Sequence, residues 1–537
     1  MPAPRGLLHN RRIRIEVPSH RRSGRRVEFP ADSCGEPMLT FPSMTTARAP
    51  LRGCVVMVAT ASVLLLLAGC GGQGSGMTSG SSSSSGAHGT PIVLMASSTA
   101  NDRIPQLQIQ FTSLKLISDS GASVPLIASP LYPEMIHLNG VWEPLATGNL
   151  PPGTYTSADV TLGSALFVCT SYEAGSGLQT STFVYGQVPA SSIHISVPAP
   201  IKVTSTPAAV LLTLDVSSSV SFTSCQGGTA TNFSITPTMS LAPIALANAS
   251  SPSTGSLVTG MEGLVTSIQS ADHSFTVAGA DGTALSGPTW QINTDSNTLF
   301  QGIGSLAQLG EGMPVDIDLN PQSDGTLLAT RVSVFDLNTT DLNVFTGPMN
   351  FVSSVNPTFS LIGQQQQGYL DSTSYFSGAE LIDDRNASFQ IAGPPSRFSG
   401  LPFQAVFSAS TAVAGQNVSV TSQVPLFPAG ALPASTVTLM PQSLNGTVRA
   451  ISRSGDYTTY VLKLATYDTF PNLANQPGES LAIANPSTVV VYAGVNARML
   501  TANPIAVGSV YRFYGQVFND QGVLRMVCLQ VSDGVAL

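Results

Sequence analysis

One cysteine thiol stands at a position in the sequence where modification of its sulfur would determine where the whole protein is located. Cys70 follows an uncharged apolar run, Gly53 to Leu67, and two small residues, Ala68 and Gly69. The run has the length of a signal-peptide core, is short for a membrane span, and is preceded by arginines. A Gly/Ser tract then continues to about residue 89 and is typical of a flexible tether. The nucleophilic sulfur therefore stands between a targeting segment and the rest of the chain.

The segment Leu67-Ala-Gly-Cys70 resembles the lipobox of bacterial lipoproteins. The resemblance implies cleavage before Cys70 and lipidation of its thiol, with residues 44–69 as signal peptide and residues 70–90 as tether. More than one acyl chain is needed for stable anchoring, and lipoproteins of this kind carry several. Gly71, in place of an aspartate, implies the outer membrane of a bacterial cell envelope, on its periplasmic or surface face. An uncleaved transmembrane anchor is the alternative.

Residues 1–43 carry eight arginines between Arg5 and Arg26 and show no hydrophobic pattern. Basic runs bind nucleic acid or acidic lipid, but this run precedes a secretion signal. Met44 opens a segment of ordinary signal-peptide form, and Met38 is a second candidate start. We therefore expect residues 1–43 to be a mis-assigned extension that contributes nothing to the fold.

The chain beyond the signal peptide is acidic. Residues 70–537 hold 12 Lys and Arg against 26 Asp and Glu, which gives a net charge of −14. Their three lysines are Lys115, Lys202 and Lys463. Because phosphate backbones are bound by clusters of basic side chains, nucleic acid is excluded as a partner.

Composition and pattern predict an all-β protein, since Val, Thr, Gly and Pro favour strands separated by turns. In a first domain, residues 91–246, Leu107 to Phe111 alternates between apolar and polar residues, as a half-buried strand does. Asn139-Gly140 predicts a hairpin turn between two short strands. The spacing of strands and turns predicts a Greek-key β-sandwich. A Ser/Pro/Ala linker follows at 247–255 and predicts separate cores on its two sides.

Three cysteines remain beyond Cys70, namely Cys169, Cys225 and Cys528. Cys169 and Cys225 each follow an apolar strand of the first domain, so in an oxidising compartment they are expected to form a disulfide. Two buried thiols are the alternative. The chain has no Cys-x-x-Cys, which excludes zinc ribbons and thioredoxin-like chemistry.

After the Leu-x-Ile-x-Phe strand, the first domain contains Trp142-Glu-Pro-Leu145, Leu150-Pro-Pro-Gly-Thr-Tyr-Thr156 and Phe233-Ser-Ile-Thr-Pro237. These motifs, in this order, resemble domain-of-unknown-function family 4382, although the family's usual Pro-Ala-Gly is Pro-Pro-Gly here. The resemblance implies a prealbumin-like sandwich. The family has no established active site, so it implies no catalytic residue.

Three diverged repeats are expected beyond the linker, at residues 256–337, 344–441 and 443–537. In each, a glycine opens a bent first strand (Gly263, Gly347 and Gly446), and a Gly-x-x-Val unit, loosened to Val507-Gly-Ser-Val510 in the third repeat, leads into a later strand. The second repeat has an insertion at Gln364–Ser377, and the third is loose. Strands of this kind can close a small β-barrel and remove their own edges. The pattern resembles domain-of-unknown-function family 5666.

The sequence signal for a metal site is weak. Asp316, Asp318 and Asp324 have carboxylates at short spacing, but an EF-hand loop would need glycine and glutamate where Pro321 and Leu327 stand. Alternation with apolar residues favours a strand with a solvated acidic face, so we expect no metal site and no cofactor.

No catalytic residue is predicted either. The histidines beyond the tether stand apart from one another, without partner motifs, and are expected to be structural (His137, His194 and His273). Trp142 and Trp290 could stack on sugars, but each lies among apolar residues and is expected in the core.

These features favour an extracytoplasmic lipoprotein with non-catalytic binding or structural β-modules. Its expected partners are the lipid bilayer, through acylated Cys70, and an envelope protein or a glycan. The alternatives are a carbohydrate-binding or adhesin module, which would show an exposed aromatic surface, and a glycan-active hydrolase, which would bring acidic loop residues together in a pocket.

Overall fold

The computed structural model describes the chain from residue 89 to residue 534, with gaps. The described residues are 89–99, 103–172, 179–188, 192–205, 208–221, 224–226, 229–231, 234–244, 246, 256–279, 288–338, 343–368, 380–423, 431–465, 468–474, 481 and 483–534. They fall in one compact unit. The expected extension, signal peptide, Cys70, tether and linker 247–255 lie outside them, apart from the end of the tether. No helix among the described residues is both long and apolar enough to cross a membrane.

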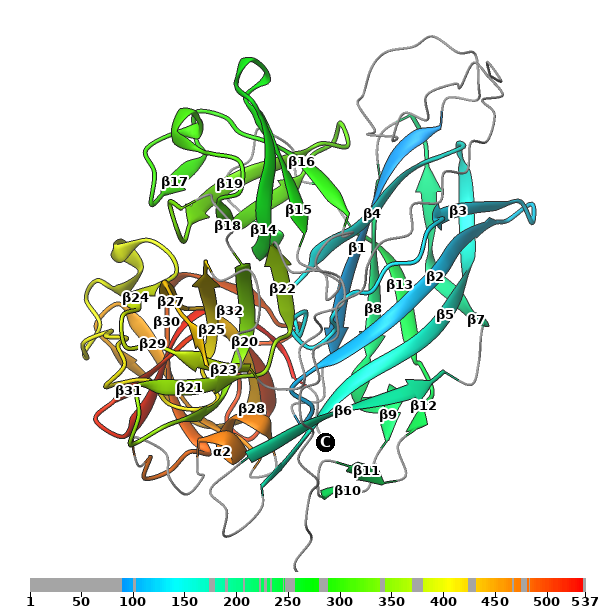
Figure 1. The fold of residues 1–537 in the computed structure, drawn as a ribbon. Coiled ribbons are helices and arrows are strands. Elements are labelled where there is room, and N and C mark those ends of the chain that lie inside the picture. The colour runs from blue at the N-terminus through cyan, green and yellow to red at the C-terminus, as the bar shows by residue number, and fades with distance from the viewer. Residues whose placement is uncertain are drawn as a thin grey trace, which may run out of the picture. The chain divides into compact units, whose positions relative to one another are not determined.

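The first domain consists of two β-sheets with one apolar core between them, which confirms the predicted sandwich (Figure 1). One sheet has the order β13 (Met239–Ile244), β8 (Ala208–Asp215), β1 (Thr90–Thr99), β4 (Glu143–Leu150). The other has the order β3 (Ser123–Ile127), β2 (Leu107–Ser118), β5 (Gly153–Tyr172), β6 (Gln179–Gln187), and β7 (Ser192–Val203) also pairs with β5. Short elements are α1 (Val216–Ser219), β9 (Val220–Ser221), β10 (Ser224–Gln226), β11 (Thr229–Thr231) and β12 (Ser234–Ile235).

Local sequence explains the central strands of the sandwich. Leu107, Ile109 and Phe111 alternate along β2 and all three are buried, which confirms the predicted strand. At the start of β5 the hydroxyl of Tyr155 donates to the carbonyl oxygen of Pro151 at 2.9 Å. This bond ties the Pro-Pro-Gly turn to the strand that follows, as a tyrosine corner does in Greek-key sandwiches.

The predicted hairpin at Asn139-Gly140 is wrong in part. Gly140 does form a turn, with φ +76°, because glycine adopts positive φ without strain. No strand precedes the turn directly, and the next strand, β4, begins only at Glu143. Asn139 instead forms an isolated bridge with Ser98. The turn serves an interface, described below, and not a hairpin.

The first repeat is a closed circuit of five strands. β14 (Val258–Gln269) pairs with β15 (Ser274–Gly279) on one side and with β18 (Pro314–Pro321) on the other. β15 pairs with β16 (Thr289–Asn293), and β18 pairs with β19 (Leu327–Val334). A parallel pair between β16 and β19 closes the circuit. A sixth strand, β17 (Leu299–Gln301), also pairs with β19. Helical turns η2 (Ser270–Asp272) and η3 (Leu306–Gln308) connect strands. The circuit is that of a five-stranded Greek-key barrel of the OB type.

The third repeat has the same circuit, closed by a parallel pair between its third and fifth strands. Its barrel is formed by β28 (Gln442–Ser454), β29 (Tyr457–Lys463), β30 (Thr488–Leu500), β32 (Val523–Asp533) and β31 (Val510–Asp520), in that order around the barrel. The short helix α2 (Thr469–Leu473) lies between β29 and β30 in sequence.

The second repeat follows the same order with an interrupted fifth strand. β20 (Asn343–Val352) pairs with β21 (Thr358–Leu361) and with β25 (Asn417–Ser422), and β21 pairs with β23 (Glu380–Asp383). The fifth strand is split into two pieces. β26 (Leu432–Pro433) runs parallel to β23, and β27 (Thr436–Leu439) pairs with β25. β24 (Ser388–Ile391) pairs with β27, β22 (Gln365–Gly368) pairs with β20, and η4 (Pro395–Phe398) follows β24. The predicted insertion, Gln364–Ser377, contains β22, and its residues 369–377 lie outside the described residues.

The first-strand glycines occupy equivalent places in the three barrels. Gly263, Gly347 and Gly446 pair with Val315, Val418 and Tyr511 of the respective fourth strands. A Cβ on any of the three would lie 2.7 Å or less from a backbone carbonyl oxygen. Only glycine allows this close approach, so these positions hold the bend in the first strand.

The glycines before the fourth strands are equivalent as well, in Gly-x-x-Val units of the first two repeats and in Gly508-Ser-Val510 of the third. Gly312, Gly415 and Gly508 have φ of +83°, +91° and +91°. Each donates its N–H at 2.8 Å to a first-strand carbonyl two residues beyond the first-strand glycine (Val265, Met349 and Val448). The three barrels are therefore built on one repeated hydrogen-bond pattern.

The cores are not separate, contrary to the prediction from the linker. Val93 and Met95 of β1 and Ala209 of β8 point away from the sandwich core and belong to the apolar core of the first barrel. Phe518 and Val527 of the third barrel likewise belong to the core of the second barrel. The domain limits given above remain a prediction, because shared cores do not settle where one module can be cut from the next.

A fragment of residues 91–246 is expected to be less stable than a fragment of residues 91–337. Cutting the chain at 246 removes the first barrel and exposes Val93 and Met95. Burial of these two side chains contributes about 4 kcal/mol to the free energy of unfolding. This difference corresponds to a decrease in melting temperature of roughly 10 °C, measurable by circular dichroism. Met95→Gln in the shorter fragment should improve its solubility. Equal melting temperatures would mean that the sandwich does not depend on the first barrel.

Candidate functional site

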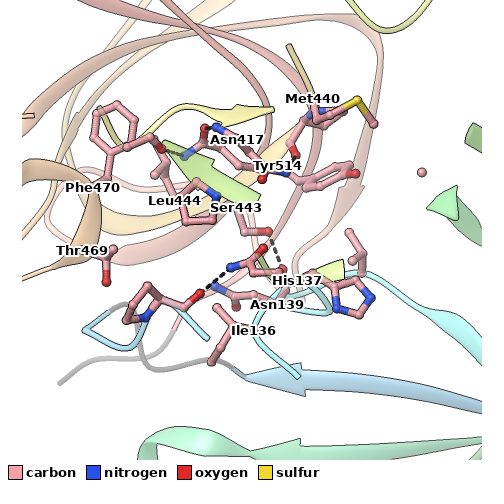
Figure 2. Close-up of a pocket in the computed structure, with 18 of the residues that line it drawn as sticks. Ile136, His137, Asn139, Asn417, Met440, Ser443, Leu444, Thr469, Phe470 and Tyr514 are labelled. Carbon is pink, nitrogen blue, oxygen red and sulfur yellow. Dashed lines mark hydrogen bonds between the residues drawn. The ribbon is translucent and has the colours of Figure 1, made fainter. Parts of the chain in front are cut away.

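A cavity of about 110 Å³, partly open to solvent, is lined by residues of the sandwich and of all three barrels. Figure 2 shows Ile136, His137 and Asn139 of the sandwich on one side, and residues of the second and third barrels opposite them. Gly260 and Glu262 of the first barrel complete the lining. No module contains this cavity by itself, so we refer to it as the junction cavity.

Side-chain amides and a hydroxyl fasten the modules around the junction cavity. Ser443 donates to the carbonyl oxygen of Asn139, as the dashed line in Figure 2 marks, and Gln530 donates to that of Gly140 at 2.7 Å. Gln364 of the second barrel donates to the carbonyl oxygen of Pro105 at 2.6 Å. The Asn139-Gly140 turn is thus the point at which the third barrel is bonded to the sandwich.

The second and third barrels are joined in the same way. Gln416 donates at 2.8 Å to the carbonyl oxygen of Val517. Gln442, the first residue of β28, donates at 3.0 Å to that of Gly415. Within the second repeat, Asn417 donates at 3.0 Å to that of Pro441. In each of these bonds a side-chain amide donates one N–H to a backbone carbonyl oxygen.

His137 bridges two carboxylates beside the junction cavity. Its Nδ1 lies 3.1 Å from Oε2 of Glu134, and its Nε2 lies 3.2 Å from Oε2 of Glu143. Burial opposes protonation, but the two carboxylates outweigh it and raise the pKa of His137 to about 10. Glu134 also accepts from the backbone N–H groups of Leu107 and Ile136. His137 is therefore a protonated structural bridge at neutral pH, a role in line with the prediction that it is structural.

Glu262 is a buried carboxyl group at the contact between two barrels. Burial, above all, raises its pKa to about 8, and the charge of Asp316 adds to the effect. Thr346 of the second barrel donates to Oε2 of Glu262 at 2.6 Å and lies 2.9 Å from the hydroxyl of Ser419. Glu262 is therefore protonated at neutral pH and is held by a neighbouring module.

The three aspartates considered as metal ligands have other partners. Arg331 donates to Asp316 at 2.7 Å and to both oxygens of Asp318 at 2.7 and 2.8 Å. Asp324 lies in the turn before β19 and accepts from the backbone and hydroxyl of Thr326. The solvated acidic face predicted for this strand is wrong, because Asp316 is only 1% exposed. Arg331 pairs with Asp318 across the β18–β19 ladder, and sequence spacing alone does not reveal this register.

The paired aspartates differ in how readily they ionise. Burial raises the pKa of Asp316 despite its bond to Arg331. For Asp318 burial acts the same way, but the guanidinium of Arg331 outweighs it and the pKa falls below its ordinary value. Burial and the positive charge of Arg331 both lower the pKa of Arg397, a side chain of the second barrel. Charges of two barrels thus influence one another here.

Asp468 is a further buried acid, and it lines the junction cavity. It is 4% exposed, and burial raises the pKa of its carboxyl to about 6. Oδ2 accepts from the N–H of Ala465 at 2.8 Å, whereas Oδ1 has no hydrogen-bond partner among the described residues. Sequence reasoning missed both Asp468 and Glu262. The available signal for Glu262 was that it is the one charged residue in the otherwise uncharged segment of β14.

The structure locates the two tryptophans and one of the three cysteines considered in the sequence analysis. Trp290 is buried in the core of the first barrel, as expected, and Trp142 of the sandwich packs against that core. Cys528 is a buried free thiol, and burial raises its pKa to about 12. The side chains of Cys169 and Cys225 lie outside the description, so their disulfide stays a prediction. Within the described ranges, no three His, Cys, Asp or Glu side chains are grouped to hold a metal ion.

Comparison with known families matches one part of the chain. Residues 262–333 match the family described as Domain of unknown function (DUF5666). This stretch runs from β14 to β19 and so covers nearly all of the first barrel, in line with the resemblance expected for the first repeat. A search of curated proteins found no significant match.

Proposed function

We propose that the protein is an extracytoplasmic lipoprotein of the bacterial cell envelope, anchored in the outer membrane through acylated Cys70, whose β-modules bind a ligand without catalysing a reaction. The sequence Leu67-Ala-Gly-Cys70 and the tract that follows support the anchor. The observation that supports binding is the junction cavity, which every module helps to line. A flexible tether would let the modules meet their partner at a distance from the membrane surface.

Binding is a better account of this cavity than hydrolysis. Glu143 and Glu262 both line it, as a glycan hydrolase would require of two acids. However, Glu143 is paired with His137, and Glu262 accepts from Thr346. A catalytic pair needs one acid and one base that can reach the substrate with their hydrogen bonds free. An adhesin would need an aromatic surface, but Trp290 is buried and Trp142 packs against a core.

Cys70→Ala is expected to abolish metabolic labelling of the protein with palmitate and to move it from the membrane to the soluble fraction. The thiol is the acceptor of the first lipid, so no other side chain can replace it. Cys528→Ala is the matched control, because it removes a buried thiol far from the signal peptide. Labelling is measured by gel fluorescence of an alkynyl palmitate analogue. A tag that persists in Cys70→Ala contradicts the proposed anchor.

A further inference from the structure

We propose that the junction cavity binds a small organic cation, a primary amine of a few heavy atoms, with Asp468 as its anionic partner. The inference rests on the binding role proposed above and adds the chemical class of the ligand. Three features carry it: a buried acid with a free oxygen, further acceptors in the same lining, and the charge of the lining.

Asp468 has an oxygen for which the fold provides no donor. It precedes α2, where a side chain commonly caps the helix by accepting from the second or third N–H. The third helical residue is Pro471, which has no N–H, and the Asp468 side chain makes no capping bond. Oδ1 is therefore left buried without a partner. An unpaired buried carboxylate oxygen is costly, and a ligand N–H would remove that cost.

Two further oxygens of the lining lack donors. Among the residues that the structure describes, neither Oδ1 of Asn417 nor the hydroxyl of Thr469, which can accept as well as donate, has a hydrogen-bond partner, and both are buried. The amides of Gln364, Asn417 and Gln442 each direct one N–H to a backbone carbonyl. The oxygens of Asp468 and Asn417 are thus acceptors for which these amides supply no donor. An ammonium group, with three N–H bonds, complements this arrangement.

The charge of the lining favours a cation over a neutral donor. Of the acids in the lining, Glu262 is protonated and Glu143 is balanced by the protonated His137, so the carboxylate of Asp468 is the uncompensated charge. The lining contains neither lysine nor arginine. Arg103, an exposed residue, acts on Asp468 through its charge but is not part of the lining. The ring of Phe470 also lines the cavity, and Figure 2 shows it beside Thr469. An aromatic face adds attraction for a cation within reach.

The size of the cavity limits the ligand. A water molecule needs about 10–15 Å³ of this kind of volume, so 110 Å³ accommodates a molecule of only a few heavy atoms. A short alkylamine fits this limit, with its ammonium group at Asp468 and its alkyl chain toward apolar residues such as Leu444 and Leu464.

The test is calorimetric titration of the detergent-solubilised exported chain with n-butylamine hydrochloride, and with n-butanol as neutral analogue. We expect the amine to bind with a Kd of about 1 mM and n-butanol to bind at least tenfold more weakly. Asp468→Asn should weaken amine binding at least tenfold, because the charge is lost while the side-chain oxygen can still accept from Ala465. Asp456→Asn, the same change in an exposed turn of the same barrel, should leave binding unchanged.

Thr469→Val provides a second variant should Asp468→Asn fail to fold, since it removes only one hydroxyl and should weaken amine binding several-fold. Equal binding of n-butanol and the amine, or amine binding unaffected by both cavity variants, overturns the inference. If n-butanol binds in the cavity and the amine does not, the cation is wrong but the binding role stands. If neither binds, the binding role of the cavity falls together with the inference.

Discussion

Arg331→Leu is expected to lower the free energy of unfolding by about 4 kcal/mol, because removing one partner of a buried ion pair leaves an unpaired charge. Arg331 holds Asp316 and Asp318 through three bonds of 2.7–2.8 Å. Without it, Asp316 would be buried next to Asp318 and would have lost the arginine that is hydrogen-bonded to both. The measurement is chemical denaturation of the exported chain at pH 7, followed by far-ultraviolet circular dichroism.

Two controls separate this effect from a general loss of charge. Arg385→Leu removes an arginine of the second barrel that is paired with Asp383 but 61% exposed, and its cost should stay below about 1 kcal/mol. The triple variant Arg331→Leu, Asp316→Val, Asp318→Asn removes the buried charges together. It should recover most of the stability, because well-packed apolar replacements of buried ion pairs are often neutral. A single variant as stable as the wild type would show that the cluster contributes nothing.

The second large effect concerns pH and Glu262. Its pKa is about 8 in the folded protein against an ordinary value of 4.5. The folded state therefore keeps a proton that the unfolded chain releases, so the stability is fully present below pH 4.5 and is lost as the pH rises through 8. The loss from this group is roughly 5 kcal/mol across the window.

Glu262→Gln should abolish this part of the pH dependence. Glutamine keeps the shape and can still accept from Thr346, but it carries no charge at high pH. The variant should match the wild type near pH 4.5 and exceed it by several kcal/mol at pH 9. His137 also loses stabilising charge as the pH rises from 6.5 through about 10, but it does so in both proteins and cancels in the difference. Glu311→Gln, at an exposed turn of the same barrel, is the control. Parallel pH profiles of wild type and Glu262→Gln would contradict a protonated Glu262.

The sequence by itself determined the elements and their repetition. Alternation of apolar and polar residues along Leu107–Phe111 predicted β2, because this pattern of a half-buried strand is set by residues that follow one another in the sequence. The first-strand glycines and the Gly-x-x-Val units predicted the repeats, because a positive φ or a close backbone approach demands glycine wherever it occurs. The all-β fold followed from these signals, and the first barrel was found where its pattern was most regular.

Only the tertiary structure decided which polar groups meet. Glu262 reads as an ordinary strand glutamate, and its burial depends on Thr346, which lies in the next barrel. Asp316 alternates with apolar residues as a solvated side chain would, yet Arg331 and the neighbouring modules enclose it. Asp468 keeps a free oxygen because Pro471 cannot donate and because other modules close the cavity around it. Each of these outcomes depends on contacts between residues far apart in the chain, and burial then changes the protonation of the groups involved, which no local pattern encodes.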